Sequence, residues 1–237
     1  MEEVRGNELD LSIVMPCLNE ETTVGLCVDD AWRFMKNNDI SGEVIVVDNG
    51  STDASPDVAR AHGANVIFEP KRGYGRALRT GFENARGKVI IMGDCDTTYD
   101  FLNLKEMYEP LALGKCDMVI GNRYAGGIEE GAMPQLHKLG VRFLSYCGRI
   151  KFGIKVYDFH CGIRGFTKDA YKKMELKTDG MEFATELIAE AARKTLFVRE
   201  IPVPLRKCTQ NRKSKLRTVR DGMRHLLYIL KYKKDRI

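Results

Sequence analysis

The feature that most constrains the fold of this chain is an alternation between short apolar runs and helical segments. The runs cover residues 11–16, 43–48, 65–68, 88–94 and 116–121. Apolar runs without alternating polar positions are typical of strands buried on both faces of a parallel sheet. Segments with helical spacing lie between them, the first ending near Asn37. We therefore predict an α/β fold with a mostly parallel central sheet flanked by helices.

Beyond residue 125 the pattern loosens, and several glycines suggest a mobile loop. Further along we predict helices over 135–152 and 181–195, a strand over 197–203, and an amphipathic basic helix over 216–232. The sequence contains no internal repeat and no clear linker. A single domain over residues 1–237 is the most economical interpretation.

The composition favours a cytoplasmic protein, soluble or peripheral at the cytoplasmic face of a membrane. No uncharged apolar run approaches the roughly 18 residues that a membrane-spanning helix needs. The N-terminus, MEEVRGNELD, lacks the basic and apolar regions of a signal peptide. The seven cysteines include no CxxC pair, which disfavours a disulfide framework or a zinc ribbon and fits a reducing compartment.

Positive charge is concentrated at the C-terminal end. Residues 206–237 hold twelve Lys and Arg against two acids, whereas the whole chain has a net charge of +5. Such a segment favours an anionic partner, either a membrane lipid, a nucleic acid or a phosphorylated substrate. Its apolar residues recur at helical spacing and predict one apolar face, made of Leu216, Val219, Met223, Leu226, Leu227 and Leu230. That face either lies on an anionic membrane surface or packs on the catalytic domain, and the sequence leaves both open.

Two acids, Asp94 and Asp96, directly follow the apolar run VIIMG. Carboxylates two residues apart on an extended loop can turn their oxygens toward one cation. Mg²⁺ and Mn²⁺ prefer oxygen ligands and usually keep substrate phosphates in their coordination shell. A solvated acidic loop is the alternative, but the position at the end of a predicted buried strand favours a metal site.

Polar residues also follow the first two predicted strands. Asp48 precedes Asn-Gly-Ser-Thr-Asp and can accept hydrogen bonds from a base or ribose, while Gly50 permits a tight turn beside a ligand. Capping of the next helix is the alternative role of this turn. Because ligands of such sheets bind at the carboxyl ends of the strands, we expect these loops to meet at one site.

Taken in order, the segments resemble family 2 glycosyltransferases of the GT-A fold. The resemblance rests on SIVMPCLNEE, EVIVVDNGSTDAS, KRGYGRALRTGFENARG, VIIMGDCDTTYDF and MVIGNRY. It continues in HCGIRGFTKDAY, GMEFATELIAEAARK and SKLRTVRDGMRHLLYIL, which look like the dolichyl-phosphate mannose and glucose synthase branch. Together these blocks span most of the chain.

The resemblance implies roles for residues around a nucleotide-sugar donor. Asp94 and Asp96 would bind the metal, and Thr98 stands where mannosyl synthases often have a Gln ligand, so the third protein ligand is left open. Asp48 would hold the base or ribose. The other residues implied at the donor are Pro16, Asn19, Glu20, Gly50, Gly73, Gly75, Arg76, Arg164, Lys215 and Arg217.

For the acceptor, Arg123 resembles an arginine that those enzymes use near the acceptor phosphate, since a planar guanidinium suits two phosphate oxygens. Arg164 would face either the diphosphate or the acceptor. Glu182, or Glu186 four residues later, would be the general base for a hydroxyl acceptor. A structural role is the more common one for a lone histidine such as His160.

The resemblance implies an inverting hexosyltransferase that depends on Mg²⁺ or Mn²⁺. It would use a nucleotide sugar, UDP-glucose before GDP-mannose, and a polyprenyl or dolichyl phosphate as acceptor. A hydroxyl acceptor, a nucleotidyltransferase and a nucleotide-binding scaffold are the alternatives. A nucleic-acid-binding protein would explain the basic tail but not acids at successive strand ends, so we expect no nucleic acid partner. The sequence leaves the oligomeric state open.

Overall fold

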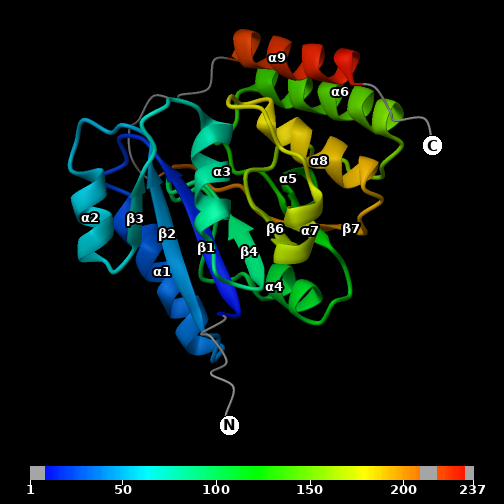
Figure 1. The fold of residues 1–237 in the computed structure, drawn as a ribbon. Helices are drawn as coiled ribbons and strands as arrows, with labels where there is room; N and C mark the ends of the chain where they lie inside the picture. Colours follow the sequence, from blue (N-terminus) through cyan, green and yellow to red (C-terminus); the bar gives the residue numbers. More distant parts are fainter. Residues whose placement is uncertain (1–8, 209–217, 233–237) are drawn as a thin grey trace.

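The computed structural model describes residues 9–208 and 218–232 of the chain. Its centre is a seven-stranded sheet with the strand order β3-β2-β1-β4-β6-β5-β7 (Figure 1). The ladder pairs are parallel except those of β6, which is antiparallel to both neighbours. The strands are β1 (Leu11–Cys17), β2 (Gly42–Asp48), β3 (Asn65–Phe68), β4 (Val89–Met92), β5 (Met118–Asn122), β6 (Arg164–Thr167) and β7 (Val198–Pro202).

Two details of the sheet differ from the sequence prediction. Pro16 does not end β1, which continues to Cys17. Proline is tolerated there because β4 pairs with β1 only up to Val14, so Pro16 has a neighbouring strand on one side. The prediction also missed β6, whose sequence RGFT carries little strand signal. It forms because the edges of β4 and β5 both pair with it.

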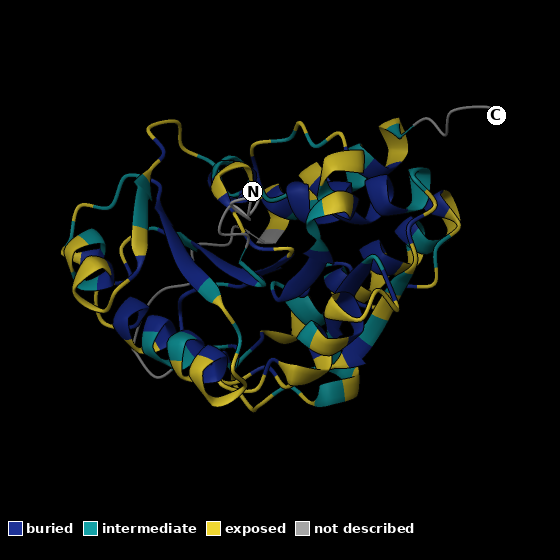
Figure 2. Cartoon of the chain, turned by 60° about the horizontal axis from the view of Figure 1, so that its bottom comes forward, coloured by how far each residue is buried: buried dark blue, intermediate teal, exposed yellow. Residues whose placement is uncertain are grey.

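Helices cover both faces of the sheet, and β1, β4 and most of β5 are therefore buried (Figure 2). The predicted helices are confirmed, with α6 matching 135–152. The helices are α1 (Val24–Asn37), α2 (Ser55–Ala61), α3 (Tyr74–Asn84), α4 (Lys105–Ala112), α5 (Arg123–Gly126), α6 (Gln135–Phe152), α7 (Lys168–Lys173), α8 (Phe183–Arg193) and α9 (Thr218–Lys231). None of these described helices combines the length and apolar character needed to cross a bilayer.

The helices α6 and α9 lie side by side along one side of the molecule, at the top of Figure 1. Residues near the N-terminal ends of both helices line one cavity. At their C-terminal ends the rings of Phe152 and Tyr232 meet, with centroids 4.7 Å apart. The two helices therefore run in the same direction. Helix α8 contacts both of them.

Most of the predicted apolar face of the C-terminal helix does not pack on the domain. Val219, Met223, Leu227 and Leu230 are 45–75% exposed, and Leu226 is half-buried. The face of α9 that packs inward instead carries Asp221, His225 and Ile229. The alternative of inward packing is therefore wrong for Val219, Met223, Leu227 and Leu230, whereas Leu226 packs against the core. Leu216 lies outside the described residues.

Candidate active site

The loops that follow β1 and β2 are tied to each other at the carboxyl edge of the sheet. The Asn19 side-chain oxygen accepts a hydrogen bond from the N–H of Thr52 at 2.7 Å, and the N–H of Asn19 donates to Ser51 Oγ at 2.9 Å. The next N–H, that of Glu20, donates to Ser55 Oγ at 2.7 Å. Asn19 thus joins two loops, with a positive φ of 53° that asparagine tolerates better than most residues.

Between these loops and the start of α3 lies a pocket of about 370 Å³, here called the outer pocket. Its wall includes Pro16, Glu20 and Gly73, which were predicted for the nucleotide site, and the predicted metal ligands Asp94 and Asp96. Five positions from three separate segments of the sequence therefore meet as predicted. Their contact with a nucleotide stays a prediction.

Asp48 and Gly50 lie beside the outer pocket rather than in its lining. The Asp48 carboxylate is 3% exposed and accepts hydrogen bonds from the N–H groups of Gly50 and Ser51 at 3.1–3.3 Å. It therefore stabilises its own turn. It does not cap the next helix, which was the alternative role predicted for this segment, since α2 begins at Ser55 and its N-cap residue is Ala54. The neighbouring Asn49 lines the pocket, and its side-chain oxygen accepts from the N–H of Gly73 at 2.7 Å.

The two glycines at the start of α3 permit close approaches. A Cβ at Gly73, where φ is 155°, would lie 2.3 Å from the carbonyl oxygen of Asp179. A Cβ at Gly75 would lie 2.6 Å from Phe183, so this glycine lets α3 approach α8. Arg76 donates to Glu69 at 3.2 Å, and the outer pocket does not include it in its lining. The structure thus gives Gly75 a packing contact with α8 and Arg76 a hydrogen bond to Glu69. Their contact with phosphates stays a prediction.

Asp94 and Asp96 are held in an arrangement that fits a cation. Burial and the nearby Asp96 carboxylate raise the pKa of Asp94 to about 7, against a hydrogen bond from Tyr74 that lowers it. Thr98 donates its N–H to Asp96 Oδ1 at 3.1 Å, so the residue in the place of the Gln orients the second acid. The described residues contain no group of three or more potential metal-ligating side chains. Phosphate oxygens and water would complete the shell.

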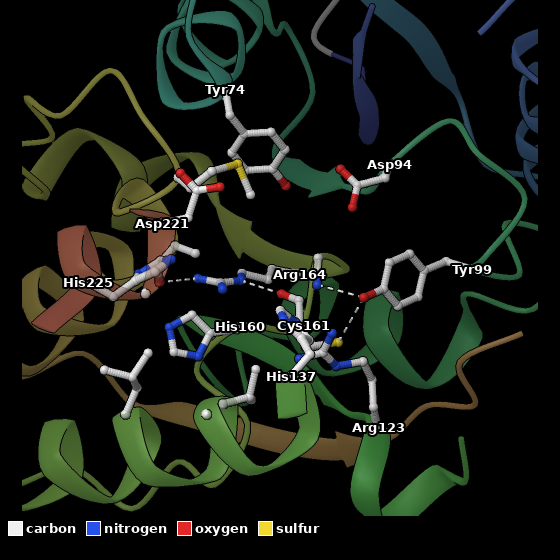
Figure 3. A pocket seen from close by; sticks show the side chains of 17 residues that line it. Tyr74, Asp94, Tyr99, Arg123, His137, His160, Cys161, Arg164, Asp221 and His225 are labelled. Carbon is white, nitrogen blue, oxygen red and sulfur yellow. Dashed lines mark hydrogen bonds between the residues drawn. The ribbon is translucent and has the colours of Figure 1, made fainter. Parts of the chain in front are cut away.

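A second cavity of about 150 Å³, here called the inner cavity, also has Asp94 in its wall (Figure 3). It shares Tyr74, Asp94 and Met181 with the outer pocket. The N-terminal halves of α6 and α9 contribute His137 and Asp221 to its wall. Two binding spaces therefore meet at the predicted metal ligand.

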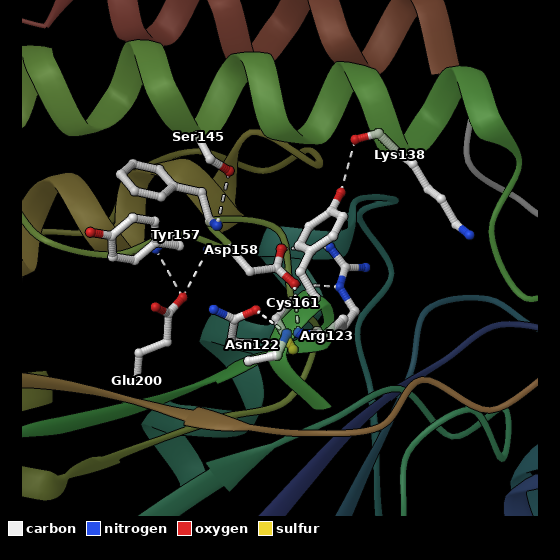
Figure 4. Close-up of polar contacts among 12 residues, drawn as sticks. Asn122, Arg123, Lys138, Ser145, Tyr157, Asp158, Cys161 and Glu200 are labelled. Carbon is white, nitrogen blue, oxygen red and sulfur yellow. Dashed lines mark hydrogen bonds and ion pairs between the residues drawn. The ribbon is translucent and has the colours of Figure 1, made fainter. Parts of the chain in front are cut away.

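Arg123 lines the inner cavity and is 6% exposed. Its Nε and Nη2 donate to the two carboxylate oxygens of Asp158 at 2.7 Å each, and its backbone N–H donates to the same carboxylate at 3.1 Å (Figure 4). Glu200 of β7 accepts hydrogen bonds from the N–H groups of Tyr157 and Asp158 and so fixes the loop that carries Asp158. This network sets the direction of the guanidinium group at the cavity wall.

Arg164 is completely buried and also lines the inner cavity. Its guanidinium group donates to the backbone carbonyls of Phe159, Cys161 and Ala184 at 2.6–2.8 Å. Three such bonds hold the chain around the cavity. A contact between Arg164 and a donor diphosphate stays a prediction.

The predicted general base does not line either cavity, although its neighbours Met181 and Ala184 line the inner one. Glu182 is the residue before α8, and its Oε2 lies 3.6 Å from Arg224 of α9. The linings of the outer pocket and the inner cavity do not include it. Glu186 is buried and accepts hydrogen bonds from the N–H groups of Lys177 and Thr178. Lys215 and Arg217 lie outside the described residues.

The sequence interpretation missed several residues of the site. Asn49, Tyr74 and Met181 line the outer pocket, while His137 and Asp221 line the inner cavity. One signal was available, since Asp221 is the sole acid in the basic stretch 216–232. Asn49, Tyr74 and Met181 lie in segments that the sequence joined to the site without singling them out, whereas His137 lies in the predicted helix 135–152, which the sequence did not connect with the site.

Three histidines line the inner cavity and are kept neutral by their surroundings. Burial, together with the nearby charges of Arg164 and His137, lowers the pKa of His225 to about 3. Burial also lowers the pKa of His160 and His137. An unfolded histidine takes up a proton near pH 6.5, whereas these buried histidines resist protonation. Their contribution to the free energy of unfolding is therefore fully present above pH 6.5 and is lost as the pH falls below it.

We expect the free energy of unfolding to fall by about 2 kcal/mol between pH 7 and pH 5 from His225 alone, with His160 and His137 adding to it in the same direction. The Asp94 carboxyl, whose pKa is raised, contributes in the opposite direction. The change due to His225 is therefore measured as the difference between the wild type and His225→Asn in urea unfolding at the two pH values. Asn keeps a polar atom near the Nδ1 position, so His225→Asn should fold and show a smaller pH dependence. An unchanged pH dependence in this variant would contradict the assignment.

A mostly parallel sheet whose carboxyl edge presents paired acids between two adjoining cavities fits the GT-A fold. The comparisons agree: a family model described as glycosyl transferase family 2 matches residues 12–175. The chain belongs to glycosyl transferase family 2, and the predicted family, fold class and enzyme class are confirmed.

Among curated relatives, the chain is 39% identical to the low-salt glycan biosynthesis hexosyltransferase Agl6 of Haloferax volcanii, over 93% of this chain and 53% of that protein. It is 31% identical to a dolichyl-phosphate hexose transferase of the same organism, over 83% of each chain. The chain thus spans about half the length of Agl6. Among solved structures, it is similar to glucosyl-3-phosphoglycerate synthase of Mycobacterium tuberculosis in complex with Mn²⁺, UDP and its product. That similarity has a TM-score of 0.73 at 22% identity, over 94% of this chain and 78% of the other, and it shows the fold.

Proposed function

We propose that this enzyme transfers a hexose, with inversion, from a nucleotide sugar to the phosphate of a polyprenyl or dolichyl lipid. UDP-glucose is the favoured donor, followed by GDP-mannose. The observation that carries the proposal is the junction of the two cavities at Tyr74, Asp94 and Met181. A donor in the outer pocket would present its sugar at this junction to an acceptor in the inner cavity.

The chain's own residues would bind and orient the two substrates. Loops after β1, β2 and β4 hold the nucleotide, and Asp94 and Asp96 would hold Mg²⁺ or Mn²⁺ together with the diphosphate. A bound cation offsets the negative charge that develops on the leaving nucleoside diphosphate. Lys215 and Arg217 are proposed to contact the same diphosphate. Arg206, which precedes these two residues in the sequence, donates its backbone N–H to the carbonyl of Thr98 in the loop after β4.

A phosphate acceptor fits the inner cavity better than a hydroxyl acceptor does. A phosphate monoester is already anionic near neutral pH, so it needs positioning rather than deprotonation. Arg123, oriented by Asp158, would supply the positive charge. A hydroxyl acceptor needs a general base, and Glu182 instead lies beside Arg224.

The outer surface of α6 and α9 supports a lipid acceptor. It carries nine exposed large apolar side chains: Leu136, Leu139, Phe143, Tyr146, Ile150, Val219, Met223, Leu227 and Leu230. Helix α6 has four Lys and Arg and no acid, and Arg220, Arg224 and Lys231 add positive charge from α9. We call this surface the α6–α9 face. Apolar side chains with basic neighbours are suited to the headgroup region of an anionic bilayer. The same two helices also line the inner cavity, so a bilayer on this face would lie close to the proposed acceptor site.

Transfer assays test the proposed function. Radiolabelled UDP-glucose and GDP-mannose are supplied with Mn²⁺ and either a short polyprenyl phosphate or the corresponding free alcohol. We expect product with the phosphate and none with the alcohol. Thermal shifts with UDP and GDP identify the base, since a ligand that binds the native state raises its stability. Glycosylation of a soluble sugar alcohol instead of the lipid phosphate would refute the acceptor assignment and draw attention to Asp221, the acid that α9 contributes to the cavity.

We expect the protein to sediment with liposomes that contain anionic lipid at low salt and to be released at high salt, because each basic residue near the surface contributes about 1 kcal/mol that salt screens. Leu139→Glu combined with Phe143→Glu should weaken binding at least tenfold, since two apolar side chains lose their burial in the membrane.

Leu113→Glu is the matched control, because Leu113 is 65% exposed but lies beyond α4, outside the α6–α9 face. It should sediment like the wild type. Equal sedimentation of the double variant and this control, or no sedimentation of the wild type at low salt, would rule out the membrane assignment.

A further inference from the structure

The wall of the inner cavity contains a polar atom that the fold leaves without a partner. His160 lines the cavity, and its Nδ1 is buried with no hydrogen-bond partner among the described residues. An unmet buried polar group costs stability, and native proteins rarely keep one without a reason. The atom therefore points to a ligand with a polar group.

The other nitrogen of the same ring belongs to a chain of contacts that reaches α9, from which His225 lines the same cavity as His160 (Figure 3). Nε2 of His160 lies 3.4 Å from Thr185 Oγ1, and the same oxygen lies 2.8 Å from Nδ1 of His225. The two imidazole rings stand edge to face, with centroids 4.3 Å apart. Thr185 is completely buried on α8, so the hydroxyl between the rings is fixed in place.

We propose that Nδ1–H of His160 donates a hydrogen bond to the acceptor's phosphate group in the inner cavity. Thr185 and His225 hold the ring in the tautomer that makes this possible. The inference rests on the proposed function and adds to it a positioning residue for the acceptor.

The direction of the contacts follows from the ligand's chemistry. A phosphate dianion offers only acceptors, so Nδ1 of His160 must carry the proton. Nε2 is then an acceptor, and the hydroxyl proton of Thr185 must point to it. That hydroxyl oxygen in turn accepts from Nδ1–H of His225. Each of the three contacts then has one donor and one acceptor, which makes His225 of α9 the residue that selects the tautomer.

The surroundings favour an anion over water in this position. Arg123, Arg164 and His137 line the same cavity and all carry N–H donors. The acids in the lining are Asp94, which would face the metal, and Asp221. A phosphate monoester held by His160 and Arg123 would lie in the cavity that adjoins Asp94 and therefore next to the transferred sugar.

Two pairs of matched variants test the proposal. His160→Asn keeps a polar group near the Nδ1 position, whereas His160→Gln places one near Nε2 and removes it from the cavity. Thr185→Ser keeps the hydroxyl, and Thr185→Val removes it at equal volume. Calorimetry measures binding of a short polyprenyl phosphate to each protein saturated with Mn²⁺ and UDP. We expect the Gln and Val variants to bind it on the order of tenfold more weakly or worse, as for loss of a hydrogen bond to a charged group. The Asn and Ser variants should stay close to the wild type.

Two further measurements separate positioning from structure. The KM for the nucleotide sugar should be unchanged in all four variants, and the ¹⁵N spectrum of His160 should show the Nδ1–H tautomer when the lipid phosphate is added. If the wild type binds the lipid phosphate and His160→Gln binds it equally well, this inference is overturned while the proposed function stands. If the wild type does not bind it, the acceptor assignment falls, and the inference falls with it.

Discussion

Asp96→Asn is expected to lower the rate of sugar transfer by on the order of a thousandfold and to leave the fold intact. The side chain lies in the wall of the outer pocket, and Thr98 orients its carboxylate. Asparagine preserves the shape but removes the charge that attracts a divalent cation. Loss of one group that stabilises transition-state charge typically costs about 10²–10³ in rate, and a weakened metal site adds to this loss.

The measurement combines transfer rates at saturating Mn²⁺ with calorimetric binding of Mn²⁺ in the presence of UDP. Asp57→Asn is the control, because Asp57 is an exposed acid of α2 and should behave like the wild type. Near-normal transfer by Asp96→Asn, or transfer that EDTA does not inhibit, would show that the paired acids do not hold a catalytic metal.

Asp158→Ala is expected to lower the free energy of unfolding by about 3–5 kcal/mol. The side chains of Arg123 and Asp158 are 7% and 0% exposed, and three hydrogen bonds join the two residues. Removing the carboxylate leaves a buried positive charge without compensation, which is the costly way to break a buried ion pair. The same change frees the Arg123 guanidinium from its fixed direction, so binding of the acceptor should weaken as well.

Urea unfolding monitored by circular dichroism measures this loss. The exposed pair between Asp57 and Arg60 supplies the control, because its side chains are 84% and 58% exposed. Asp57→Ala should therefore change stability by less than about 1 kcal/mol. Asp158→Asn, which keeps one oxygen acceptor, should fall between the two. Equal stability of Asp158→Ala and the wild type would mean that the buried pair contributes little.

Local patterns predicted the parts of the fold that depend on few neighbours. The apolar runs 43–48 and 65–68 match β2 and β3, and the helix over 135–152 matches α6 residue for residue. The antiparallel β6 was missed because its four residues form a strand through the ladders of β4 and β5 rather than through their own propensity.

The candidate site divides in the same way. Acids at strand ends can be recognised in a sequence, and Asp94 and Asp96 do lie together at the outer pocket. Asp48 satisfied the same pattern, yet its carboxylate caps the turn at Gly50 and Ser51, because backbone N–H groups nearby compete with any ligand for it. A polar residue at a strand end can thus face a pocket or its own loop, and local sequence does not distinguish the two.

The sequence by itself determined the buried strands, the amphipathic helices and the paired acids, because each of these depends on residues close together in the chain. The tertiary structure alone decided which side of α9 is buried, with His225 inward and Leu227 outward. It also decided that Arg123 is paired with Asp158, 35 residues away, and that His160, Thr185 and His225 meet at one cavity. These outcomes depend on how distant segments pack against each other, and the free energy of such contacts does not appear in any local pattern of residues.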